Sequence, residues 1–445
     1  MAAAQYNKKV CPDRAAAIDA ETERLEIGLA AGGMAVSGAR RGVALLAFYF
    51  PPENTSGVQR ALRMYRYLPE FGYQTHVVCS SHAGQVQMDR VRHVPANGAD
   101  PETAARAEWA RRLQRSLLPY DERLPWVPHA VAAAGQWIRD GAISAVISTS
   151  PPTAPHLAAW RLKRKYGVRW IADFRDPILG NPGRSRRWAQ PYDKFLERLI
   201  LAGADRVTAV TDAIAARWRR EHPRHAHKIE VIWNGFDPAD GFGPQPLPPR
   251  ARRVLLHSGV LYYQRHPLAL LDSLERIIAR GLADPSSLVL RFTGIIQGRE
   301  ELLGRPSVQA LAARGCLEMP GVNVPRQQAM QEIASSDWLL LIDIVNDQGA
   351  GYTVPAKIFD YILTGRPILA ITDRNSPVEN ILNGSGVPVT ALYHSDTDAE
   401  IDEKLARFLR LPSEPAVAPS EWFLERFDGR RQAGQMARLL ASLGV

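Results

Sequence analysis

Short apolar runs alternate along this chain with segments in which apolar residues recur at helical spacing. The earliest run, Val43–Phe50, is followed by a segment of helical periodicity from Val58 to Leu68 and then by a second run, Thr75–Cys79. Short apolar runs separated by helices are typical of parallel sheets that are covered on both faces. This opening therefore predicts a parallel βαβ arrangement and an α/β fold.

The same alternation continues to the C-terminus and predicts two successive sets of strands and helices. We expect strands at Val43–Phe50, Thr75–Cys79, Ala145–Thr149, Trp170–Ala172, Ala204–Val210, Ile229–Ile232, Val254–His257, Leu288–Phe292, Trp338–Ile342, Ile368–Ile371 and Val387–Ala391. We expect further helices at Glu102–Leu118, Val131–Ile138, His156–Tyr166, Asp212–Arg219, Leu268–Ala279, Gln328–Ala334, Ala399–Leu409 and Arg430–Leu443.

The proline- and glycine-rich stretch Phe242–Arg250 separates the two sets and is typical of an interdomain linker. The predicted fold class is α/β, with two Rossmann-like doubly wound domains at residues 41–240 and 250–415. Residues 1–40 are alanine-rich and are expected to form a loosely ordered extension. Residues 418–445 are expected to hold a C-terminal helix that packs back toward the first domain. The first strand is not followed by G-x-G-x-x-G, so a dinucleotide fingerprint is not supported.

Composition narrows the class of protein. The chain has 445 residues, of which 46% are hydrophobic and 23% charged, as in soluble globular proteins. No apolar run approaches the ~20 residues of a membrane span. The three cysteines, Cys11, Cys79 and Cys316, show neither metal-binding spacing nor a disulfide framework, which favours a reducing, cytoplasmic location.

The net charge of +9 is compatible with an anionic membrane surface or with a compositional bias toward arginine. The basic residues are dispersed and no recognised nucleic-acid motif is present, so nucleic acid is not an expected partner.

The stretch from Gly351 to Ile371 has the pattern of a loop, a short helix, a turn and a buried strand. Pro355 suits the first turn of the helix, and Gly365 suits the left-handed residue that ends it. A helix start fed by a glycine-containing loop offers N–H groups to an anion. Lys357 and Asp360 share one face of this helix, where they could hold a phosphate and a sugar hydroxyl, or form an ordinary i,i+3 ion pair.

Charged residues also follow a buried strand in the first domain. The string Asp173-Phe174-Arg175-Asp176-Pro177 comes directly after Trp170–Ala172. The carboxyl ends of strands are where open α/β sheets bind ligands. The alternative is an arginine–aspartate cluster that only fixes a loop.

Several motifs, in order, resemble those of the family-four (retaining) glycosyltransferases of the GT-B fold. They are the Tyr49–Gly57 loop, Thr149-Ser150-Pro151-Pro152, Asp173–Pro177, the hinge string Asn234–Asp237, Gly259 with a cation six residues later at Arg265, Met319–Val322, and Gly351–Pro367. The resemblance covers residues 43 to 440, nearly the whole chain. It implies two domains facing a cleft, with a nucleotide-sugar donor mainly on the second domain and an acceptor mainly on the first.

The resemblance also assigns donor-binding residues. Asp360 corresponds to the acid that binds a ribose hydroxyl, and Val322 lies in the loop that contacts the nucleobase. The leaving diphosphate needs fixed cations and N–H groups. The candidate cations are Arg265 and Lys357, and the candidate backbone positions are Gly57, Gly259 and the helix start near Pro355.

For the acceptor side, the resemblance favours Asp173 or Asp176 as the group nearest the acceptor or the reacting sugar, and Arg60 is a weaker candidate than Gly57. For Gly57 the alternative is a helix-start glycine, and for Arg60 a solvated arginine. The string Asp396–Asp398 lies away from the other motifs and is expected to be solvated.

The implied activity is transfer of a sugar from a nucleotide-sugar to a hydroxyl of a glycan, a lipid-linked molecule or a small-molecule acceptor, with retention, in glycan or glycoconjugate (for example polysaccharide) biosynthesis. The resemblance implies no metal and no cofactor besides the nucleotide-sugar co-substrate. It is compatible with a cytoplasmic enzyme that makes peripheral contact with the inner membrane face.

Two alternatives remain open. A nucleotide-sugar epimerase shares the two-domain architecture but needs a general acid/base set that the sequence does not reveal. A degenerate, non-catalytic sugar-nucleotide-binding protein is suggested by Tyr352 and Val260, where the family has an acid and an arginine.

Overall fold

The computed structural model describes residues 41–53, 56–81, 84–96, 123–181, 187–262, 267–344 and 353–445. Among them the chain forms two compact units. Unit 1 contains the described residues up to Val210 together with Arg217–Ile232 and Gln432–Val445, and unit 2 contains Thr211–Ala216 and Trp233–Arg431.

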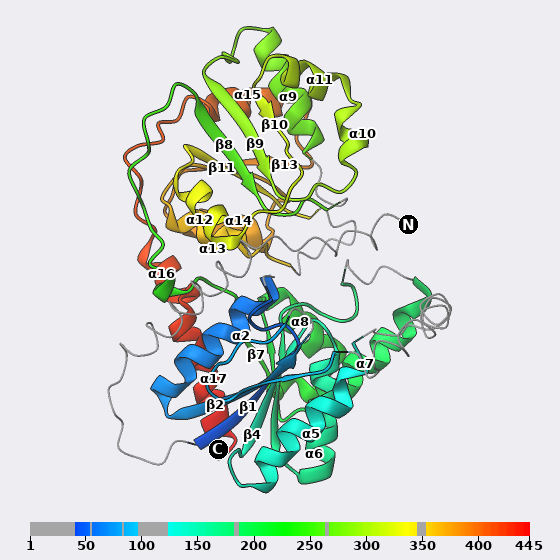
Figure 1. Cartoon of the computed structure of the whole chain (residues 1–445). Coiled ribbons are helices and arrows are strands. Elements are labelled where there is room, and N and C mark those ends of the chain that lie inside the picture. Colours follow the sequence, from blue (N-terminus) through cyan, green and yellow to red (C-terminus); the bar gives the residue numbers. More distant parts are fainter. Residues whose placement is uncertain are drawn as a thin grey trace, which may run out of the picture. The chain divides into compact units, whose positions relative to one another are not determined.

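Unit 1 is built on a parallel sheet of seven strands in the order β3-β2-β1-β4-β5-β6-β7 (Figure 1). Its strands are β1 (Arg41–Ala47), β2 (Tyr73–Ser80), β3 (Val91–Val94), β4 (Ala145–Ser150), β5 (Arg169–Phe174), β6 (Arg206–Ala209) and β7 (Ile229–Val231). Its helices are α2 (Ser56–Tyr67), α5 (Trp126–Arg139), α6 (Ala154–Tyr166), α7 (Gln190–Gly203), α8 (Asp212–Glu221), which begins in unit 2, and α17 (Gly429–Ser442). The 3-10 helices η2 (Leu68–Phe71), η4 (Arg187–Ala189) and η5 (Pro223–Lys228) connect them.

The strands of unit 1 are buried on both faces, as their continuous apolar runs predict. In β1, Val43 and Leu45 pack in one cluster with Ala61 of α2 and with Met436 and Leu440 of α17. The intervening β1 residues are also buried, and α5 and α6 lie along that other side of the sheet (Figure 1). The last helix of the chain thus belongs to the core of the first sheet.

Unit 2 repeats this plan with a parallel sheet in the order β10-β9-β8-β11-β12-β13. Its strands are β8 (Arg253–Ser258), β9 (Leu288–Thr293), β10 (Leu317–Glu318), β11 (Trp338–Ile342), β12 (Ile368–Thr372) and β13 (Val389–Tyr393). Its helices are η6 (Pro238–Asp240), α9 (Leu268–Ala279), α10 (Arg299–Leu303), α11 (Pro306–Ala313), α12 (Arg326–Ala334), α13 (Lys357–Leu363), α14 (Pro377–Gly384), α15 (Asp398–Phe408) and α16 (Glu421–Phe427).

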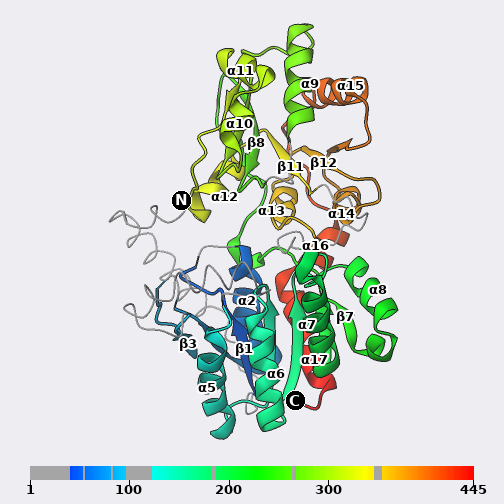
Figure 2. The same cartoon turned by 90° about the vertical axis from the view of Figure 1, so that its right-hand side faces the viewer.

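Alternate residues of the unit 2 strands divide between two cores. Leu255 of β8 and Leu340 of β11 pack in the cluster that includes α9, α11 and α15. Leu256 and Leu341 pack in the cluster that includes α13, α14 and α16. Figure 2 shows α9 and α15 on one side of the sheet and α13 and α14 on the other. No helix in the described parts of the chain combines the length and apolarity needed to cross a bilayer.

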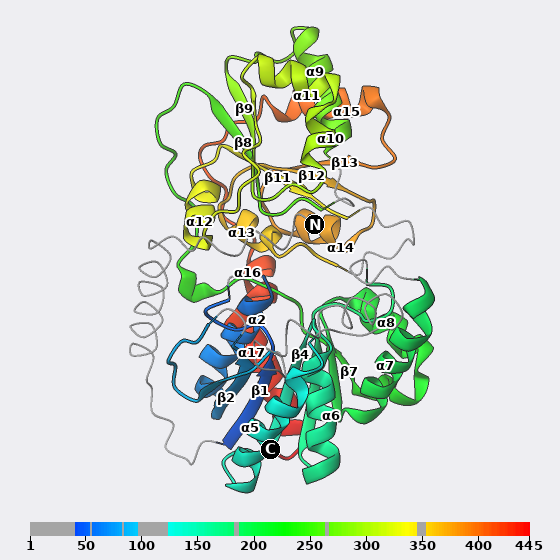
Figure 3. The same ribbon diagram turned by 45° about the vertical axis from the view of Figure 1, so that its right-hand side comes forward.

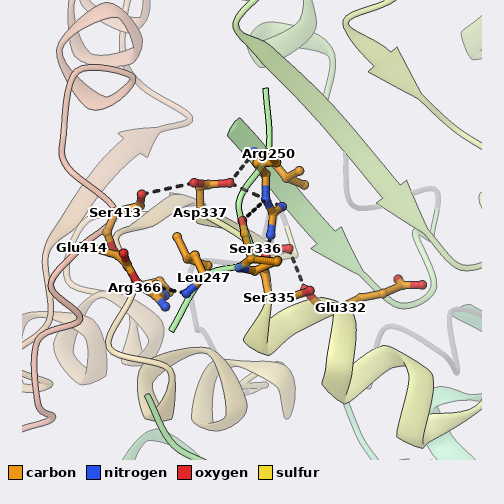
Figure 4. Close-up of polar contacts among 11 residues, drawn as sticks. Leu247, Arg250, Glu332, Ser335, Ser336, Asp337, Arg366, Ser413 and Glu414 are labelled. Atoms are coloured by element: carbon orange, nitrogen blue, oxygen red, sulfur yellow. Dashed lines mark hydrogen bonds and ion pairs between the residues drawn. The ribbon is translucent and has the colours of Figure 1, made fainter. Parts of the chain in front are cut away.

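The buried side chains of Arg366 and Asp337 fasten two connecting segments of unit 2 to its sheet (Figure 4). Arg366 is fully buried and donates to the carbonyl oxygens of Gln245 and, at 2.6 Å, of Ser413. Asp337 accepts from Val254 N at 2.9 Å and from the Ser413 hydroxyl at 3.2 Å. These bonds hold the stretch before β8 and the stretch after α15 against the same end of the sheet.

Each of the two sheets has a switch point, where the strand order reverses. It lies between β1 and β4 in unit 1 and between β8 and β11 in unit 2. In open α/β sheets ligands bind at the carboxyl ends of the strands at such a switch point. We therefore expect ligand-binding residues at these two switch points.

The predicted α/β class with two doubly wound parallel sheets is confirmed. The first strand ends at Ala47, earlier than predicted, because Phe48–Phe50 bend into the loop. The short strands β3 and β10 and the helix α7 were not predicted. The helix predicted at Glu102–Leu118 and the N-terminal extension lie outside the described residues.

Candidate functional site

The switch point of unit 2 brings a buried histidine and a lysine together. His257 lies near the end of β8 and is completely buried, with Nδ1 3.0 Å from the carbonyl oxygen of Leu340 in β11. Its Nε2 lies 3.1 Å from Nζ of Lys357, the first residue of α13. A carbonyl can only accept, so Nδ1 carries the proton and Nε2 accepts from the lysine ammonium. This neutral tautomer holds Lys357 at the carboxyl end of β8.

Two glycines leave the backbone open beside that lysine. Gly259 and Gly294 have φ of 108° and 117°, a conformation that side chains rarely adopt. A Cβ on Gly294 would lie 2.6 Å from the carbonyl of Gly259, and a Cβ on Gly259 would lie 3.1 Å from Nζ of Lys357. A side chain at Gly259 would therefore crowd the ammonium group, so a glycine at this position lets the backbone lie directly beside Lys357.

The start of α13 is fixed to the neighbouring strand. Pro355 is buried, and its carbonyl accepts from Ile358 N at 3.1 Å. The Tyr361 hydroxyl accepts from Ser258 N at 2.9 Å, which ties α13 to the end of β8. The helix begins at Lys357, two residues after the proline, and Gly365 has the left-handed conformation predicted for the residue that ends it.

Asp360 lies one turn along the same helix and is half-buried. Its Oδ2 is 3.9 Å from Nη1 of Arg326, and the Nη2 of that arginine donates to Asp240 at 2.9 Å. The carboxylate thus has a long ion pair with a cation that is engaged elsewhere. Val322 follows β10 and is 54% exposed. Arg265 and Tyr352 lie outside the described residues.

In unit 1, Asp173 is completely buried at the end of β5. Its carboxylate accepts two bonds from Arg60 at 2.7 and 2.9 Å, one from Thr149 at 2.8 Å and one from Thr208 at 2.5 Å. Burial alone would raise the pKa of Asp173, but the Arg60 charge and these hydrogen bonds lower it. Asp173 and Arg60 thus form a buried ion pair whose carboxylate oxygens are fully hydrogen-bonded. The alternative of a solvated Arg60 is wrong.

Arg175 joins three loops at the switch point of unit 1. Its guanidinium donates to the carbonyl oxygens of Gly57 and Pro151, and to that of Ser150 at 3.1 Å. A Cβ on Gly57 would lie 3.2 Å from the guanidinium nitrogens. Gly57, in the first turn of α2, is therefore held by Arg175, the residue that directly follows β5. This arginine connects the segments that follow β1, β4 and β5.

Asp176 differs from its neighbour Asp173. It is half-buried, and burial raises the pKa of its carboxyl group despite the opposing charge of Arg175. Within the described residues its carboxylate makes no hydrogen bond or ion pair. A carboxylate with a raised pKa and no structural partner is a functional-site candidate, so of the two aspartates the geometry favours Asp176.

Sequence reasoning missed a buried histidine between two serines. The ring nitrogens of His156 lie 2.7 Å from the Ser148 hydroxyl and 2.8 Å from the Ser150 hydroxyl, and Trp170 Nε1 donates to Ser148 at 2.7 Å. Burial lowers the pKa of His156 to about 3, so the ring is neutral. The network fixes Ser150, whose carbonyl binds Arg175. A lone histidine at a helix start gives no sequence signal of this role.

A group with metal-ligand spacing occurs in unit 1, at Glu197, Glu221 and His222. Arg217 lies among these side chains, 2.8 Å from Glu197 and 3.7 Å from Glu221. Glu197 also accepts from Ile178 N and Leu179 N, at 3.0 Å each. The oxygens that a cation would need are thus occupied by an arginine and by backbone donors.

The expectation that Asp396 is solvated is wrong. Its side chain is 1% exposed, lies 2.5 Å from Lys404 Nζ, and accepts from Tyr393 N at 2.8 Å. Asp398 is exposed, as expected, and Thr397 between them caps α15. The string shapes a helix start.

Comparison with known proteins adds to this geometry. Residues 57–240 match the family model described as Glycosyltransferase Family 4. No curated protein matches the sequence. Among solved structures, the chain resembles the sucrose-phosphate synthase of Thermosynechococcus elongatus, with 13% identity, a TM-score of 0.63, and coverage of 91% of this chain and 99% of that one.

Two further structures are similar in the same way. The lipopolysaccharide outer core galactosyltransferase WaaB has 13% identity and a TM-score of 0.56, covering 91% of this chain and 99% of that one. Anabaena Alr3699/HepE, solved in complex with UDP-glucose, has 13% identity and a TM-score of 0.54, covering 90% and 99%.

The two doubly wound parallel sheets and the similarity to these solved structures show that the chain has the GT-B fold of glycosyltransferases. The chain carries a glycosyltransferase family 4 domain over residues 57–240, and it is a glycosyltransferase of that fold.

Proposed function

We propose that this glycosyltransferase binds a nucleotide-sugar on unit 2 and transfers its sugar, with retention, to a hydroxyl of a glycan, lipid-linked or small-molecule acceptor in glycan or glycoconjugate biosynthesis. The observation that carries the proposal is the Lys357 ammonium held by His257 beside Gly259, at the switch point of a parallel sheet. A fixed cation beside open backbone suits a diphosphate.

The donor would bind at the switch point of unit 2, at the carboxyl ends of β8 and β11. Lys357 would neutralise the diphosphate, the backbone of Gly259 would approach it closely, and Asp360 would accept from the ribose hydroxyls. Arg265 remains a second cation by its sequence position, and the exposed Val322 would contact the nucleobase. HepE was solved with UDP-glucose, which supports a nucleotide-sugar as the class of donor.

The chemistry follows from charge. The bond between the anomeric carbon and the diphosphate oxygen breaks, and the acceptor oxygen bonds to that carbon while its proton is released. Negative charge grows on the departing diphosphate, so a pre-positioned ammonium group stabilises the transition state more than the ground state. Retention rests on the family resemblance and on the family 4 domain.

The acceptor would lie on unit 1 at the loops that Arg175 joins. Asp176 is half-buried, and its carboxylate has no hydrogen-bond or ion-pair partner in the part of the chain that the structure describes, so it is the proposed contact for the acceptor hydroxyl. Asp173 would act only by fixing Arg60 and the neighbouring threonines. We further propose a cytoplasmic location with peripheral contact to the membrane.

We propose that transfer needs no bound metal ion or other cofactor. Support comes from Lys357, whose charge would do at the diphosphate what a divalent cation does elsewhere, and from Arg217, which occupies the Glu197–Glu221 group.

The proposal is tested by incubating the protein with a panel of nucleotide-sugars without acceptor and measuring release of nucleoside diphosphate. Slow hydrolysis of one donor, unchanged in EDTA, is expected. Epimerised sugar without release of nucleoside diphosphate would favour the epimerase. Binding without turnover of any donor, with or without a panel of acceptor sugars, would favour the non-catalytic alternative that Tyr352 and Val260 suggest.

A further inference from the structure

An arginine of unit 2 lies between the acid proposed for the ribose and a second acid that is distant in sequence. Arg326 is the first residue of α12. Its Nη2 donates to Oδ2 of Asp240 at 2.9 Å, and its Nη1 lies 3.9 Å from Oδ2 of Asp360 in α13. The two ends of a single guanidinium group thus face two carboxylates.

Arg326 reaches Asp360 because α12 and α13 pack against each other. Figure 3 shows the two helices side by side in unit 2. α12 precedes β11 and α13 precedes β12, and in a parallel sheet a helix that leads into a strand begins near the carboxyl ends of the strands. Arg326 and Lys357, the first residues of these helices, therefore lie on the side of the sheet where we expect the donor.

The position of Arg326 is not explained by the helix that carries it. The start of a helix is the positive end of its dipole, where a cation is unfavourable. An arginine at this position is stabilised by acids outside the helix. Asp240 and Asp360 are acids of this kind, and each comes from a different segment of unit 2.

Asp240 is itself fixed by a short capped helix. It is the last residue of η6, in which the buried Asp237 accepts from Ala239 N at 3.0 Å. Gly241 ends η6 with a left-handed φ of 59°. The 2.9 Å contact with Asp240 therefore holds one end of the guanidinium group and directs its other end toward Asp360.

The contact with Asp360 is of a different kind. A distance of 3.9 Å between Nη1 and Oδ2 is too long for a hydrogen bond but short enough for attraction between the two charges. Arg326 thus draws the carboxylate toward one direction without bonding to that oxygen. A carboxylate held in this way suits the paired hydroxyls of a ribose, which donate to charged oxygens.

We propose that Arg326 is a positioning residue for the nucleotide, which orients Asp360 toward the two ribose hydroxyls, and that Asp240 in turn positions Arg326. This inference rests on the proposed function, in which Asp360 binds the ribose. It adds the residues that make the site selective for a ribonucleotide.

Calorimetric titration with UDP, GDP and ADP, and with the 2′,3′-dideoxy form of each, tests the assignment. The wild type should bind one ribonucleotide about tenfold more tightly than its dideoxy form, which lacks both hydroxyls. In Arg326→Met the affinity for the ribonucleotide should fall about fivefold while that for the dideoxy form hardly changes, so the preference shrinks to about twofold. Asp240→Ala should weaken only the ribonucleotide, by about two- to threefold.

A double variant and a matched control make the test specific. Arg326→Met should add little to the loss in Asp360→Asn, because the arginine acts through that carboxylate. Arg305→Met removes an exposed arginine that directly precedes another helix of unit 2, α11, and should keep both the affinity and the preference. Thermal melts of all these variants should stay close to that of the wild type.

Two results would overturn the inference and leave the donor site in place. One is an equal weakening of the ribonucleotide and its dideoxy form in Arg326→Met, which would mean that the arginine acts on the diphosphate, the base or the fold. The other is additive losses in the double variant. A wild type that binds none of the three nucleoside diphosphates would instead overturn the proposed function, and this inference with it.

Discussion

Lys357 Nζ lies 3.1 Å from Nε2 of His257, whose Nδ1 is fixed by the carbonyl oxygen of Leu340 at 3.0 Å. The lysine belongs to α13, which follows β11, and the histidine to β8, so the contact joins the two strands at which the order of the sheet reverses. A cation aimed by a buried neutral acceptor needs little reorganisation when a phosphate arrives. The proposed binding of the donor diphosphate depends on this pair.

Removing the acceptor should loosen the lysine without removing its charge. In His257→Leu we expect kcat/KM for the donor to fall about tenfold, because Lys357 loses its orientation. His257→Gln keeps an acceptor at a similar reach and should recover much of that loss. Steady-state kinetics across donor concentrations measures both. Equal losses in the two variants would indicate a packing role only.

The two glycines should respond differently to alanine. Gly294→Ala places a Cβ 2.6 Å from backbone atoms of Gly259 at a positive φ, so we expect unit 2 to lose about 2–4 kcal/mol of stability. Gly259→Ala meets only the flexible end of Lys357, so its stability cost should be smaller and its donor affinity lower. Denaturant unfolding with a donor titration checks this order, which a greater stability loss in Gly259→Ala would contradict.

The two aspartates of unit 1 should separate stability from activity. Asp173→Asn leaves the buried Arg60 without its counter-charge, so we expect a loss of about 3 kcal/mol or more. Asp176→Asn removes a carboxylate that burial disfavours, so its stability should hardly change while transfer falls at least about tenfold. Unfolding curves and transfer rates measure the two effects. Full activity in a folded Asp176→Asn would remove Asp176 from the mechanism.

His156 should make unit 1 less stable in mild acid. The pKa of its ring is about 3 in the folded chain, below the ordinary value near 6.5, so only the unfolded chain takes up the proton as the pH falls. The stability that the neutral ring contributes to the folded chain is therefore complete above pH ~6.5 and is lost progressively toward pH ~3. The free energy of unfolding should fall by about 1 kcal/mol between pH ~7.5 and ~5.5.

The matched variant for that pH dependence is His156→Gln. It lacks the titrating ring, so the stability difference between wild type and variant should narrow by about 1 kcal/mol over the same interval. Urea unfolding at the two pH values measures it. A difference that stays constant would mean that folding does not lower the pKa of the His156 ring.

Most strands could be predicted because they are continuous apolar runs of adequate length, such as Trp338–Ile342 and Ile368–Thr372. The strand β10 has only two residues, too short for any period to show. The helix α7 was missed although its buried Leu196, Ile200 and Leu201 keep helical spacing, because the buried Asp193 and Glu197 and the exposed Phe195 interrupt the apolar pattern.

The candidate site was only partly predictable, because the direction in which a side chain points depends on tertiary contacts. The sequence shows that charges follow the apolar run Trp170–Ala172. It does not show that Asp173 points toward Arg60, or that Asp176 has no hydrogen-bond or ion-pair partner among the described residues. His257 reads as one residue of an apolar strand, and only its contact with Lys357, 100 positions later, gives it a role. Such pairings depend on tertiary contacts.

We expect a nucleoside diphosphate to bind unit 2 at the carboxyl ends of β8 and β11, beside Lys357 and Asp360. Calorimetric titration of UDP, GDP and ADP into the wild type identifies the one bound, and the same titration into Lys357→Met and Asp360→Asn tests the site. Each variant should bind about 1–3 kcal/mol more weakly, the cost of losing a charged hydrogen bond. The exposed acid Glu301, changed to Gln, is the matched control and should bind like the wild type. Thermal melting of all variants should be nearly unchanged. Dissociation constants equal to that of the wild type in both variants would show that the nucleoside diphosphate does not bind beside Lys357 and Asp360.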